Sequence, residues 1–239
     1  MRIIGHRGAM GLEPENTLRS IKRALDLGVD MVEFDVYTLK GGEIILMHDD
    51  NVDRTTNGHG LVSGFTFLDL RRLDAGQGET VPTLPEALNL INRQVPVNIE
   101  LKGSGTAEPV SAVINQYIAN AGWQSSDFTV SSFNHKELGR FKKLSPDIDT
   151  AVLLDNWQWN LLLRSPRLAV RKAKKLNSVA LNPDLKFVNR KLVESAHAQG
   201  LSVNVYTLVE NNDVLKMAQM GVDGIFCNFP DRAKEVLKR

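Results

Sequence analysis

Short apolar runs alternate with helical patterns along the whole chain of 239 residues, and this alternation restricts the fold more than any other feature. Apolar runs of four to eight residues bounded by turn-forming residues are typical of buried strands. Eight such runs are present: Arg2–Gly5, Met31–Val36, Val97–Lys102, Phe128–Ser132, Thr150–Leu154, Ser178–Leu181, Ser202–Thr207 and Asp223–Cys227. Strands that alternate with helices form a parallel sheet, and eight such units in about 240 residues have the size of a closed barrel. The pattern predicts an α/β protein with the (β/α)8 TIM-barrel fold.

The segments between the runs have the features of helices. Apolar residues recur at helical spacing after Thr17, which suits an N-cap, and stop before Gly28, which suits a C-cap. Similar patterns end at Gly122 and, over residues 189–200, at Gly200. An open doubly wound sheet is the alternative arrangement, but no Gly-x-Gly-x-x-Gly follows the first run. We expect a single domain over residues 1–239.

One long stretch interrupts the alternation. From residue 49 to residue 82 the chain is polar and rich in turn residues, with a short apolar run only at Phe65–Leu73. So long a connection in a compact domain is usually functional. We therefore expect a small subdomain inserted at about residues 49–82, after the second strand and its hairpin.

Acidic side chains gather in two of the predicted strands. Glu33 and Asp35 share one face of a strand, about 6.5 Å apart along it, and Glu100 lies near the end of the next strand in sequence. The carboxyl ends of barrel strands meet at one rim. Three carboxylates at that rim would repel one another unless a hard divalent ion with oxygen ligands removed the cost. These residues predict one Mg²⁺ or Ca²⁺ ion held by Glu33, Asp35 and Glu100, whereas zinc prefers nitrogen and sulfur ligands.

A hairpin is expected to bring a histidine to the same rim. Lys40-Gly41-Gly42-Glu43 is a strong turn signal. If its two glycines form a two-residue turn, residues whose numbers sum to 83 face each other across the hairpin. His48 would then lie opposite Asp35.

A second histidine and two cationic residues lie at the ends of predicted strands. His6 and Arg7 close the first strand, and Lys102 closes the third. Paired histidines suit general acid and base catalysis, and the two cations suit an anionic substrate, most simply a phosphate group. The expected chemistry is metal-assisted cleavage of a phosphoester. His6 and Arg7 can both point inward only if the chain has left the strand, which Gly5 and Gly8 permit.

Three further features are open to more than one interpretation. The segment Arg54–Gly58 is either a phosphate-binding turn or an ordinary loop, and the loop is favoured. Trp157 and Trp159 either line the mouth of a pocket or pack in the core. Cys227, at the end of an apolar run, is expected to be an inert core thiol.

Composition excludes several classes of protein. Lys plus Arg total 29 and Asp plus Glu total 28, without blocks of like charge, so a nucleic-acid surface is not expected. No uncharged apolar run approaches 18 residues, and a single cysteine cannot form an intrachain disulfide. The first residues enter a strand-like run at once rather than an export signal. We expect a cytoplasmic protein without stable membrane association.

The chain resembles the glycerophosphodiester phosphodiesterase family over essentially its whole length, and the motifs taken together are highly specific. The shared motifs are His6-Arg7-Gly8, Pro14-Glu15-Asn16-Thr17, Glu33-Phe34-Asp35-Val36, His48-Asp49, Arg54–Gly58, Leu73–Gly76, Pro82-Thr83-Leu84, Asn98–Lys102, Ser131-Ser132-Phe133, Gly221–Gly224 and Pro230-Asp231.

The resemblance implies a TIM barrel that hydrolyses a small glycerophosphodiester to an alcohol and sn-glycerol 3-phosphate. By motif position it implies that His6 and His48 form an acid–base pair. It also implies that Glu33, Asp35 and Glu100 bind a divalent ion. Arg7 and Lys102 would bind the phosphate. The alternatives are a phospholipid-cleaving lyase of the same fold that releases a cyclic phosphate, and a non-catalytic binder of a phosphate ligand.

The chain departs from the family pattern at two places. Tyr206 stands where many members have Trp, so this residue is a candidate for the substrate pocket. Cys227-Asn228 stands where many members have Thr-Asp. Neither position is a proposed metal ligand, so specificity is expected to change more than activity.

Overall fold

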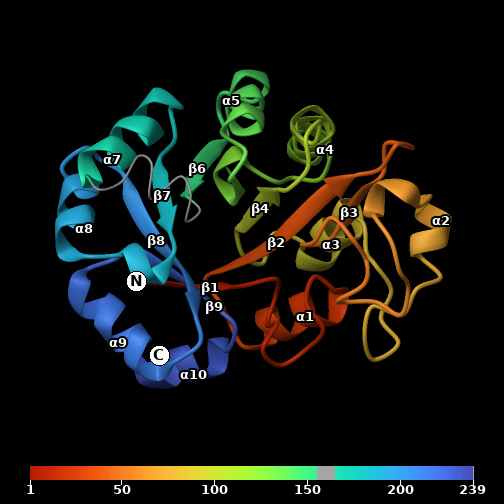
Figure 1. Ribbon diagram of the computed structural model, residues 1–239, viewed down its shortest axis with the longest axis horizontal. Helices are drawn as coiled ribbons and strands as arrows, with labels where there is room; N and C mark the ends of the chain where they lie inside the picture. The colour runs from red at the N-terminus through yellow and green to blue at the C-terminus, as the bar shows by residue number, and fades with distance from the viewer. Residues whose placement is uncertain (155–164, 239) are drawn as a thin grey trace.

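Within residues 1–154 and 165–238, which the computed structural model describes, eight parallel strands close into a barrel surrounded by helices (Figure 1). A short ninth strand, β3, pairs antiparallel with β2. The barrel closes because β1 pairs in parallel with both β2 and β9. The strands are β1 (Arg2–Gly5), β2 (Met31–Thr38), β3 (Ile44–Leu46), β4 (Val97–Leu101), β5 (Phe128–Ser132), β6 (Asp149–Leu154), β7 (Ala180–Pro183), β8 (Ser202–Leu208) and β9 (Gly224–Cys227).

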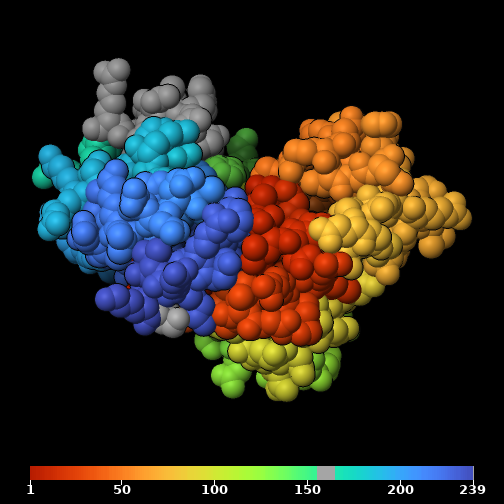
Figure 2. All heavy atoms as spheres, turned by 90° about the horizontal axis from the view of Figure 1, so that it is seen from below, coloured from red at the N-terminus to blue at the C-terminus, as the bar shows by residue number. Residues whose placement is uncertain are grey.

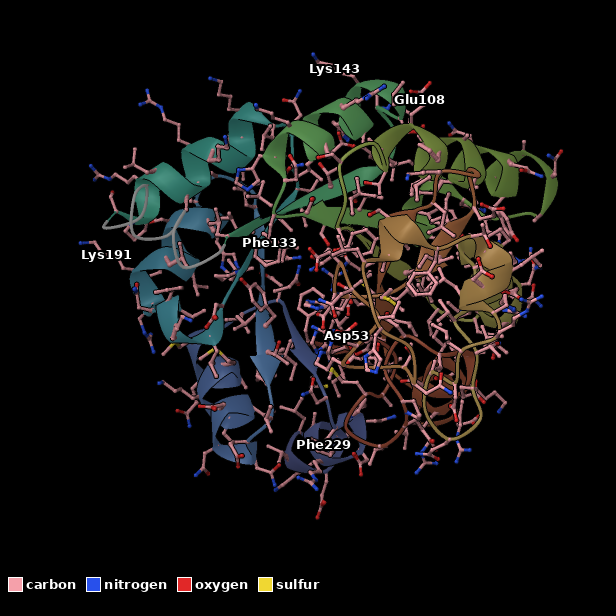
Figure 3. The ribbon with its side chains drawn as sticks, turned by 45° about the vertical axis from the view of Figure 1, so that its right-hand side comes forward. Asp53, Glu108, Phe133, Lys143, Lys191 and Phe229 are labelled. Carbon is pink, nitrogen blue, oxygen red and sulfur yellow. The ribbon has the colours of Figure 1, made fainter. Side chains whose placement is uncertain are left out.

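Helices follow the strands and cover the outside of the barrel, except for the short α2, which lies to one side of it (Figure 1). They are α1 (Leu18–Asp26), α2 (Phe67–Leu70), α3 (Leu84–Ile91), α4 (Ala107–Asn120), α5 (His135–Leu144), α7 (Pro166–Lys175), α8 (Arg190–His197), α9 (Asn211–Met220) and α10 (Pro230–Val236). Figure 3 shows Lys143 and Lys191 pointing outward from this ring, with Phe133 near its centre. Among the described helices, none is both long enough and apolar enough to cross a bilayer.

Local sequence explains where the helices begin and end. Thr17 caps α1, since its side chain accepts a hydrogen bond from the Ser20 N–H, and Gly28 follows the helix with a φ of +67°. Thr83 and Glu86 form a capping box at the start of α3. The apolar faces of these helices join one core with the outer faces of the strands.

The predicted TIM barrel is confirmed, with small shifts at the strand boundaries. The hairpin prolongs β2 as far as Thr38. The sixth predicted strand, expected from Ser178, begins two residues later, because the Ser178 N–H bonds to the Ala173 carbonyl and so completes the end of α7. Trp157 and Trp159 lie outside the described residues.

The predicted hairpin register was wrong by one residue. Strands β2 and β3 pair Val36 with Leu46 and Thr38 with Ile44, so facing residue numbers sum to 82 rather than 83. The turn contains three residues, because the Leu39 N–H bonds to the Glu43 carbonyl at 2.8 Å. Gly42 has a φ of +95°, which suits the last position of a three-residue hairpin loop.

A second hydrophobic cluster joins the insertion to the hairpin. This cluster combines Val52, Val62, Leu70, Ala75 and Val81 of the insertion with Leu39, Ile45 and Met47 of the hairpin. In Figure 2 the insertion, coloured orange to gold, projects from one side of the barrel. It is therefore built onto the outer face of the β2–β3 hairpin.

Candidate active site

A pocket of about 130 Å³ opens at the carboxyl end of the barrel. It is lined by His6, Arg7, Glu33, His48, Asn98, Glu100, Ser131, Phe133, Leu153, Tyr206, Thr207 and Phe226. Six of the eight residues that the sequence singled out line this pocket. The other two, Asp35 and Lys102, contact pocket residues from the side.

The three acidic residues meet because of strand register. Asp35 of β2 lies directly opposite Glu100 of β4, and Glu33 lies opposite Asn98. One carboxylate oxygen from each of Glu33, Asp35 and Glu100 lies within 4.8 Å of the others, and all three residues are buried. Glu33 and Asp35 were expected at the end of their strand, but the hairpin extends β2 beyond them.

Crowding perturbs the protonation of these acids. Burial and the neighbouring charges of Asp35 and Glu100 raise the pKa of Glu33 well above its usual value. Burial and Asp35 also raise the pKa of Glu100 to about 7. Burial acts in the same direction on Asp35, but Lys102 and Arg7 outweigh it and hold the pKa of Asp35 below its usual value.

The donor set fits a hard divalent cation. The Asp35 Oδ1 atom is buried and makes no hydrogen bond in the described part of the chain. A buried carboxylate oxygen without a hydrogen bond is costly, and so are three converging acids. Oxygen ligands of this kind are the ones that Mg²⁺ and Ca²⁺ prefer.

Residues outside the barrel strands orient the acids. The Asn16 side-chain amide donates to Asp35 Oδ2 at 3.0 Å, and the Asp35 N–H donates to Asn16 Oδ1 at 3.2 Å. The Arg7 N–H donates to Glu33 Oε2 at 2.8 Å. Asn16 was not identified as a site residue from the sequence, although it lies within the Pro14–Thr17 motif.

The backbone after β1 solves the geometric problem posed by adjacent His6 and Arg7. Arg7 has a φ of +50° and Gly8 a φ of +84°, so the chain turns out of the strand and both side chains reach the pocket. A Cβ on Gly8 would lie 2.5 Å from the backbone of Ser20, which excludes other residues there.

His6 is held by one of the residues that depart from the family pattern. Its Nδ1 lies 2.8 Å from Asn228 Oδ1, and its Nε2 faces Glu33 Oε2 at 4.0 Å. An amide oxygen only accepts, so Nδ1 carries the proton and Nε2 is free of it. Burial, with a contribution from Arg7, lowers the pKa of His6 to about 4.

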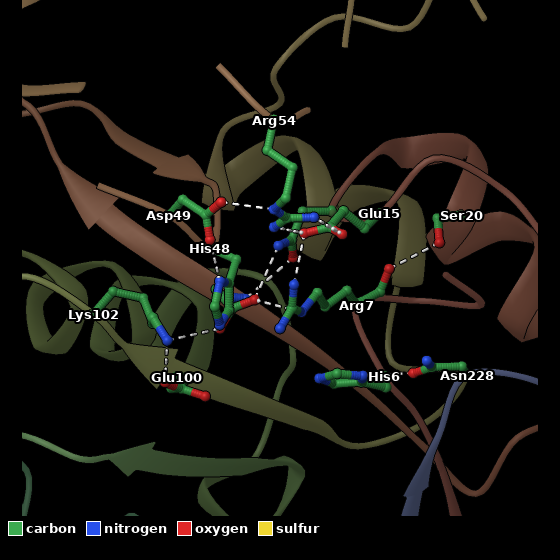
Figure 4. Close-up of polar contacts among 12 residues, drawn as sticks. His6, Arg7, Glu15, Ser20, His48, Asp49, Arg54, Glu100, Lys102 and Asn228 are labelled. Atoms are coloured by element: carbon green, nitrogen blue, oxygen red, sulfur yellow. Dashed lines mark hydrogen bonds and ion pairs between the residues drawn. The ribbon is translucent and has the colours of Figure 1, made fainter. Parts of the chain in front are cut away.

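His48 lines the pocket although its predicted partner was wrong. Met47, not His48, lies opposite Asp35, since the Met47 N–H donates to the Asp35 carbonyl at 3.1 Å. His48 lies beyond the end of β3, so the alternation of strand faces no longer decides where it points. Its Nδ1 contacts Asp49 Oδ1 at 2.5 Å, so Asp49 accepts the Nδ1 proton (Figure 4).

Two cations border the acidic cluster. Lys102 Nζ donates to Glu100 Oε1 at 2.8 Å and lies 3.7 Å from Asp35 Oδ1. Arg7 Nε lies 3.3 Å from Asp35 Oδ2. Both side chains are mostly buried beside the pocket, so they can contact an anionic group that enters it.

The opposite wall of the pocket is apolar. The rings of Phe133 and Tyr206 meet edge to face with centroids 5.8 Å apart, and Leu153 and Phe226 extend this wall. The Tyr206 hydroxyl donates to the Leu154 carbonyl at 2.9 Å. Tyr206, a candidate from sequence, therefore presents its ring to the pocket.

A larger groove, of about 800 Å³, lies outside the barrel between α7 and α8. Arg167, Arg171 and Lys174 line it together with small and aliphatic side chains. Among the lining residues that the structure describes, none is a histidine or carries a carboxylate.

Comparison with known proteins gives a consistent result. The model of the glycerophosphoryl diester phosphodiesterase family matches residues 6–232. A putative glycerophosphodiester phosphodiesterase of Bacillus subtilis, YhdW, is 35% identical over 97% of this chain and 96% of its own. A glycerophosphodiester phosphodiesterase of Caldanaerobacter subterraneus is 32% identical over 99% of this chain and 98% of its own.

Solved structures agree with these relatives. A phosphodiesterase of Oleispira antarctica, in complex with the product sn-glycerol-3-phosphate, has a TM-score of 0.86 and 29% identity, covering 100% of this chain and 97% of that one. A putative glycerophosphoryl diester phosphodiesterase of Silicibacter pomeroyi has a TM-score of 0.89 and 26% identity, covering 100% of this chain and 93% of that one.

Proposed function

The chain belongs to the glycerophosphoryl diester phosphodiesterase family, and we propose that it hydrolyses glycerophosphodiesters to an alcohol and sn-glycerol 3-phosphate with one divalent cation. The observation that carries this proposal is that two histidines line one pocket together with Glu33 and Glu100, whose carboxylates lie within 4.8 Å of Asp35 beside it. The relative from Oleispira antarctica supports the product, since its structure contains sn-glycerol-3-phosphate.

Glu33, Asp35 and Glu100 would hold the cation, and Mg²⁺ or Ca²⁺ fits their oxygen atoms. When bound, the ion would polarise the phosphoryl group and offset the charge that develops on its oxygens. Arg7 and Lys102 would bind the same phosphate, because Arg7 lines the pocket and Lys102 lies beside Glu100 at its edge.

The two histidines would move the protons. Each has its Nδ1 proton engaged, by Asn228 or by Asp49, so each can present Nε2 to the substrate. One imidazole would remove a proton from the attacking oxygen, and the other would donate a proton to the leaving alkoxide. The attacking oxygen is either water or the neighbouring glycerol hydroxyl, and the second route passes through a cyclic phosphate.

The edge-to-face wall of Phe133 and Tyr206 would contact the apolar parts of the substrate. Tyr206 would then help to determine which glycerol or head group the enzyme accepts, because its ring lines the pocket opposite the charged residues. Substrates that differ only in the head group would report on this wall.

His48→Ala tests the function most simply, with His59→Ala as the matched control. His59 is an exposed histidine of the insertion and does not line the pocket. With glycerophosphocholine and glycerophosphoethanolamine, we expect the wild type and His59→Ala to release glycerol 3-phosphate equally. His48→Ala should lose about two to four orders of magnitude in turnover, because it removes a general acid or base.

Folding and binding of Mg²⁺ or Ca²⁺ by the His48→Ala variant should be retained and can be checked by circular dichroism and calorimetry. Near-normal turnover of this variant would refute the catalytic role of His48. Phosphorus NMR of the product separates hydrolysis from the lyase reaction, in which a cyclic phosphate would accumulate as the final product.

A further inference from the structure

The insertion contributes one cationic side chain that links it to the candidate active site. Arg54 Nε donates to Asp49 Oδ2 at 2.7 Å, and its two terminal nitrogens donate to the two oxygens of Glu15 at 2.7 and 2.8 Å (Figure 4). The Arg54 guanidinium therefore binds one carboxylate on each of two edges. Arginine suits this position because its planar fork can bind a carboxylate through two parallel hydrogen bonds.

The two carboxylates that hold Arg54 each contact a proposed functional residue. Asp49 accepts the Nδ1 proton of His48 at 2.5 Å, and Glu15 Oε1 accepts a hydrogen bond from Arg7 at 2.7 Å. A continuous chain of contacts therefore runs from His48 through Asp49, Arg54 and Glu15 to Arg7. Arg54 is the middle member, and it comes from the insertion rather than from a barrel strand.

The loop that carries Arg54 is fixed by its own hydrogen bonds. The Thr56 N–H and hydroxyl both donate to the Val52 carbonyl, at 3.0 and 2.8 Å, and the Gly58 N–H donates to the Thr56 hydroxyl at 3.0 Å. Val52 is fully buried in the hydrophobic cluster that joins the insertion to the hairpin. This accounts for the Arg54–Gly58 motif: its threonine and glycine shape the loop, and its arginine points back at the barrel.

The charges along this chain of contacts are mutually stabilised. Hydrogen bonds from Arg54 and His48 hold the pKa of Asp49 well below its usual value despite partial burial. Burial would raise the pKa of Glu15, but Arg54 and Arg7 outweigh it and lower that pKa. Both acids therefore stay ionised at neutral pH and act only as acceptors.

These contacts distinguish two roles for Arg54. A phosphate-binding arginine would direct its nitrogens at the pocket, but Nε and both terminal nitrogens of Arg54 are already bound to carboxylates, and Arg54 does not line the pocket. We propose that Arg54 is a positioning residue that fixes Asp49 and thereby His48, so that the insertion is part of the acid–base machinery. The proposal rests on the proposed function, since it assigns a task to a residue behind His48.

Arg54→Met is the direct test, and Arg72→Met is its matched control. Methionine keeps much of the aliphatic stem of arginine and removes the charge. Arg72 also belongs to the insertion, but its side chain is 79% exposed and forms a long ion pair with Asp69, at 3.8 Å. We expect Arg72→Met to behave like the wild type and Arg54→Met to lose about 10- to 100-fold in kcat, the effect of a misplaced catalytic group. KM should change by less than about threefold.

A double-mutant cycle separates positioning from a general structural role. If Arg54 acts through His48, adding Arg54→Met to His48→Ala should leave kcat unchanged within about twofold. A further loss of kcat in the double mutant would overturn the proposal. Arg54→Lys keeps the charge but lacks the planar guanidinium, so its loss of kcat should be intermediate. This variant also tests the proposal if Arg54→Met does not fold.

The outcomes also separate this inference from the proposed function. If the wild type released no glycerol 3-phosphate from any glycerophosphodiester, the function would fail. If the wild type were active and both Arg54 variants had normal kcat, only the role of Arg54 would fail.

Discussion

Asp35 shows how single side chains create the chemistry of the site. It accepts a hydrogen bond from Asn16, faces Arg7 and Lys102, and still has one buried oxygen without a hydrogen bond in the described chain. Cations on two sides keep it ionised, while Glu100 opposite it is driven towards protonation. One more positive charge is the simplest addition that would balance the cluster.

The residues with a strong pattern were predictable, and their partners were not. Glu33 and Asp35 were found because a spacing of two residues puts side chains on one face of a strand. Asn16 and Asn228 were missed as partners because their contacts, to Asp35 and His6, span 19 and 222 residues of sequence. An amide in a loop has no periodicity that would reveal such a contact.

Glu100→Gln is expected to stabilise the protein when no metal is present. The Glu100 pKa is raised to about 7, above the usual value of 4.5, so ionising Glu100 destabilises the folded state as the pH rises between these values. In EDTA at pH 8, the variant should therefore melt a few degrees higher than the wild type, since about 1 kcal/mol corresponds to about 2–4 °C at this size.

The same pair of proteins gives two internal controls. Near pH 5 the folded wild type is largely protonated at Glu100, so the difference in melting temperature should shrink. Adding Mg²⁺ or Ca²⁺ at pH 8 should raise the melting temperature of the wild type but not that of the variant. A Glu100→Gln protein that melts lower than the wild type in EDTA at pH 8 would contradict this account.

At the scale of elements, the β2–β3 hairpin shows where sequence reasoning was ambiguous. Gly41 and Gly42 support either a two-residue or a three-residue turn, and the two differ by one residue in register. The structure has the three-residue turn, which moves the partner of Asp35 from His48 to Met47. The histidine still reaches the pocket because the chain leaves β3 before it.

Gly42→Ala should weaken the hairpin because alanine is strained at a φ of +95°. We expect a loss of about 1–2 kcal/mol in the free energy of unfolding, measured by urea denaturation. Gly64→Ala is the control, since a methyl group at Gly64 would meet no described atom within 4 Å and the φ of Gly64 is not left-handed. Equal stability of the two variants would show that the three-residue turn is not the one formed in solution.

For the whole molecule, the barrel was predictable because each βα unit repeats the same pattern of burial. The link between the insertion and the barrel was not predictable, because the Arg54–Glu15 contact joins two loops 39 residues apart that share no sequence pattern. A loop can look like a phosphate-binding turn in sequence and still direct its arginine at carboxylates. Only the fold shows which of the two it does.

Cys227 offers a probe of global unfolding. It is the single cysteine, it is buried, and burial raises its pKa to about 12. At pH 8 the native protein should not react with a thiol reagent such as DTNB, whereas the chain in concentrated guanidinium chloride should release one equivalent. Above pH 9 the unfolded chain loses this proton first, so stability should fall. Rapid modification of the native protein would place Cys227 on the surface.

The most direct test of the account is the dependence of activity on a divalent cation. Glycerol 3-phosphate release from glycerophosphocholine is measured for the wild type as purified, after thorough treatment with EDTA, and after Mg²⁺ or Ca²⁺ is restored. We predict that chelation abolishes turnover and that at least one of the two ions restores it, because Glu33, Asp35 and Glu100 crowd three carboxylates at one point. Full activity in the chelated protein would contradict the central claim.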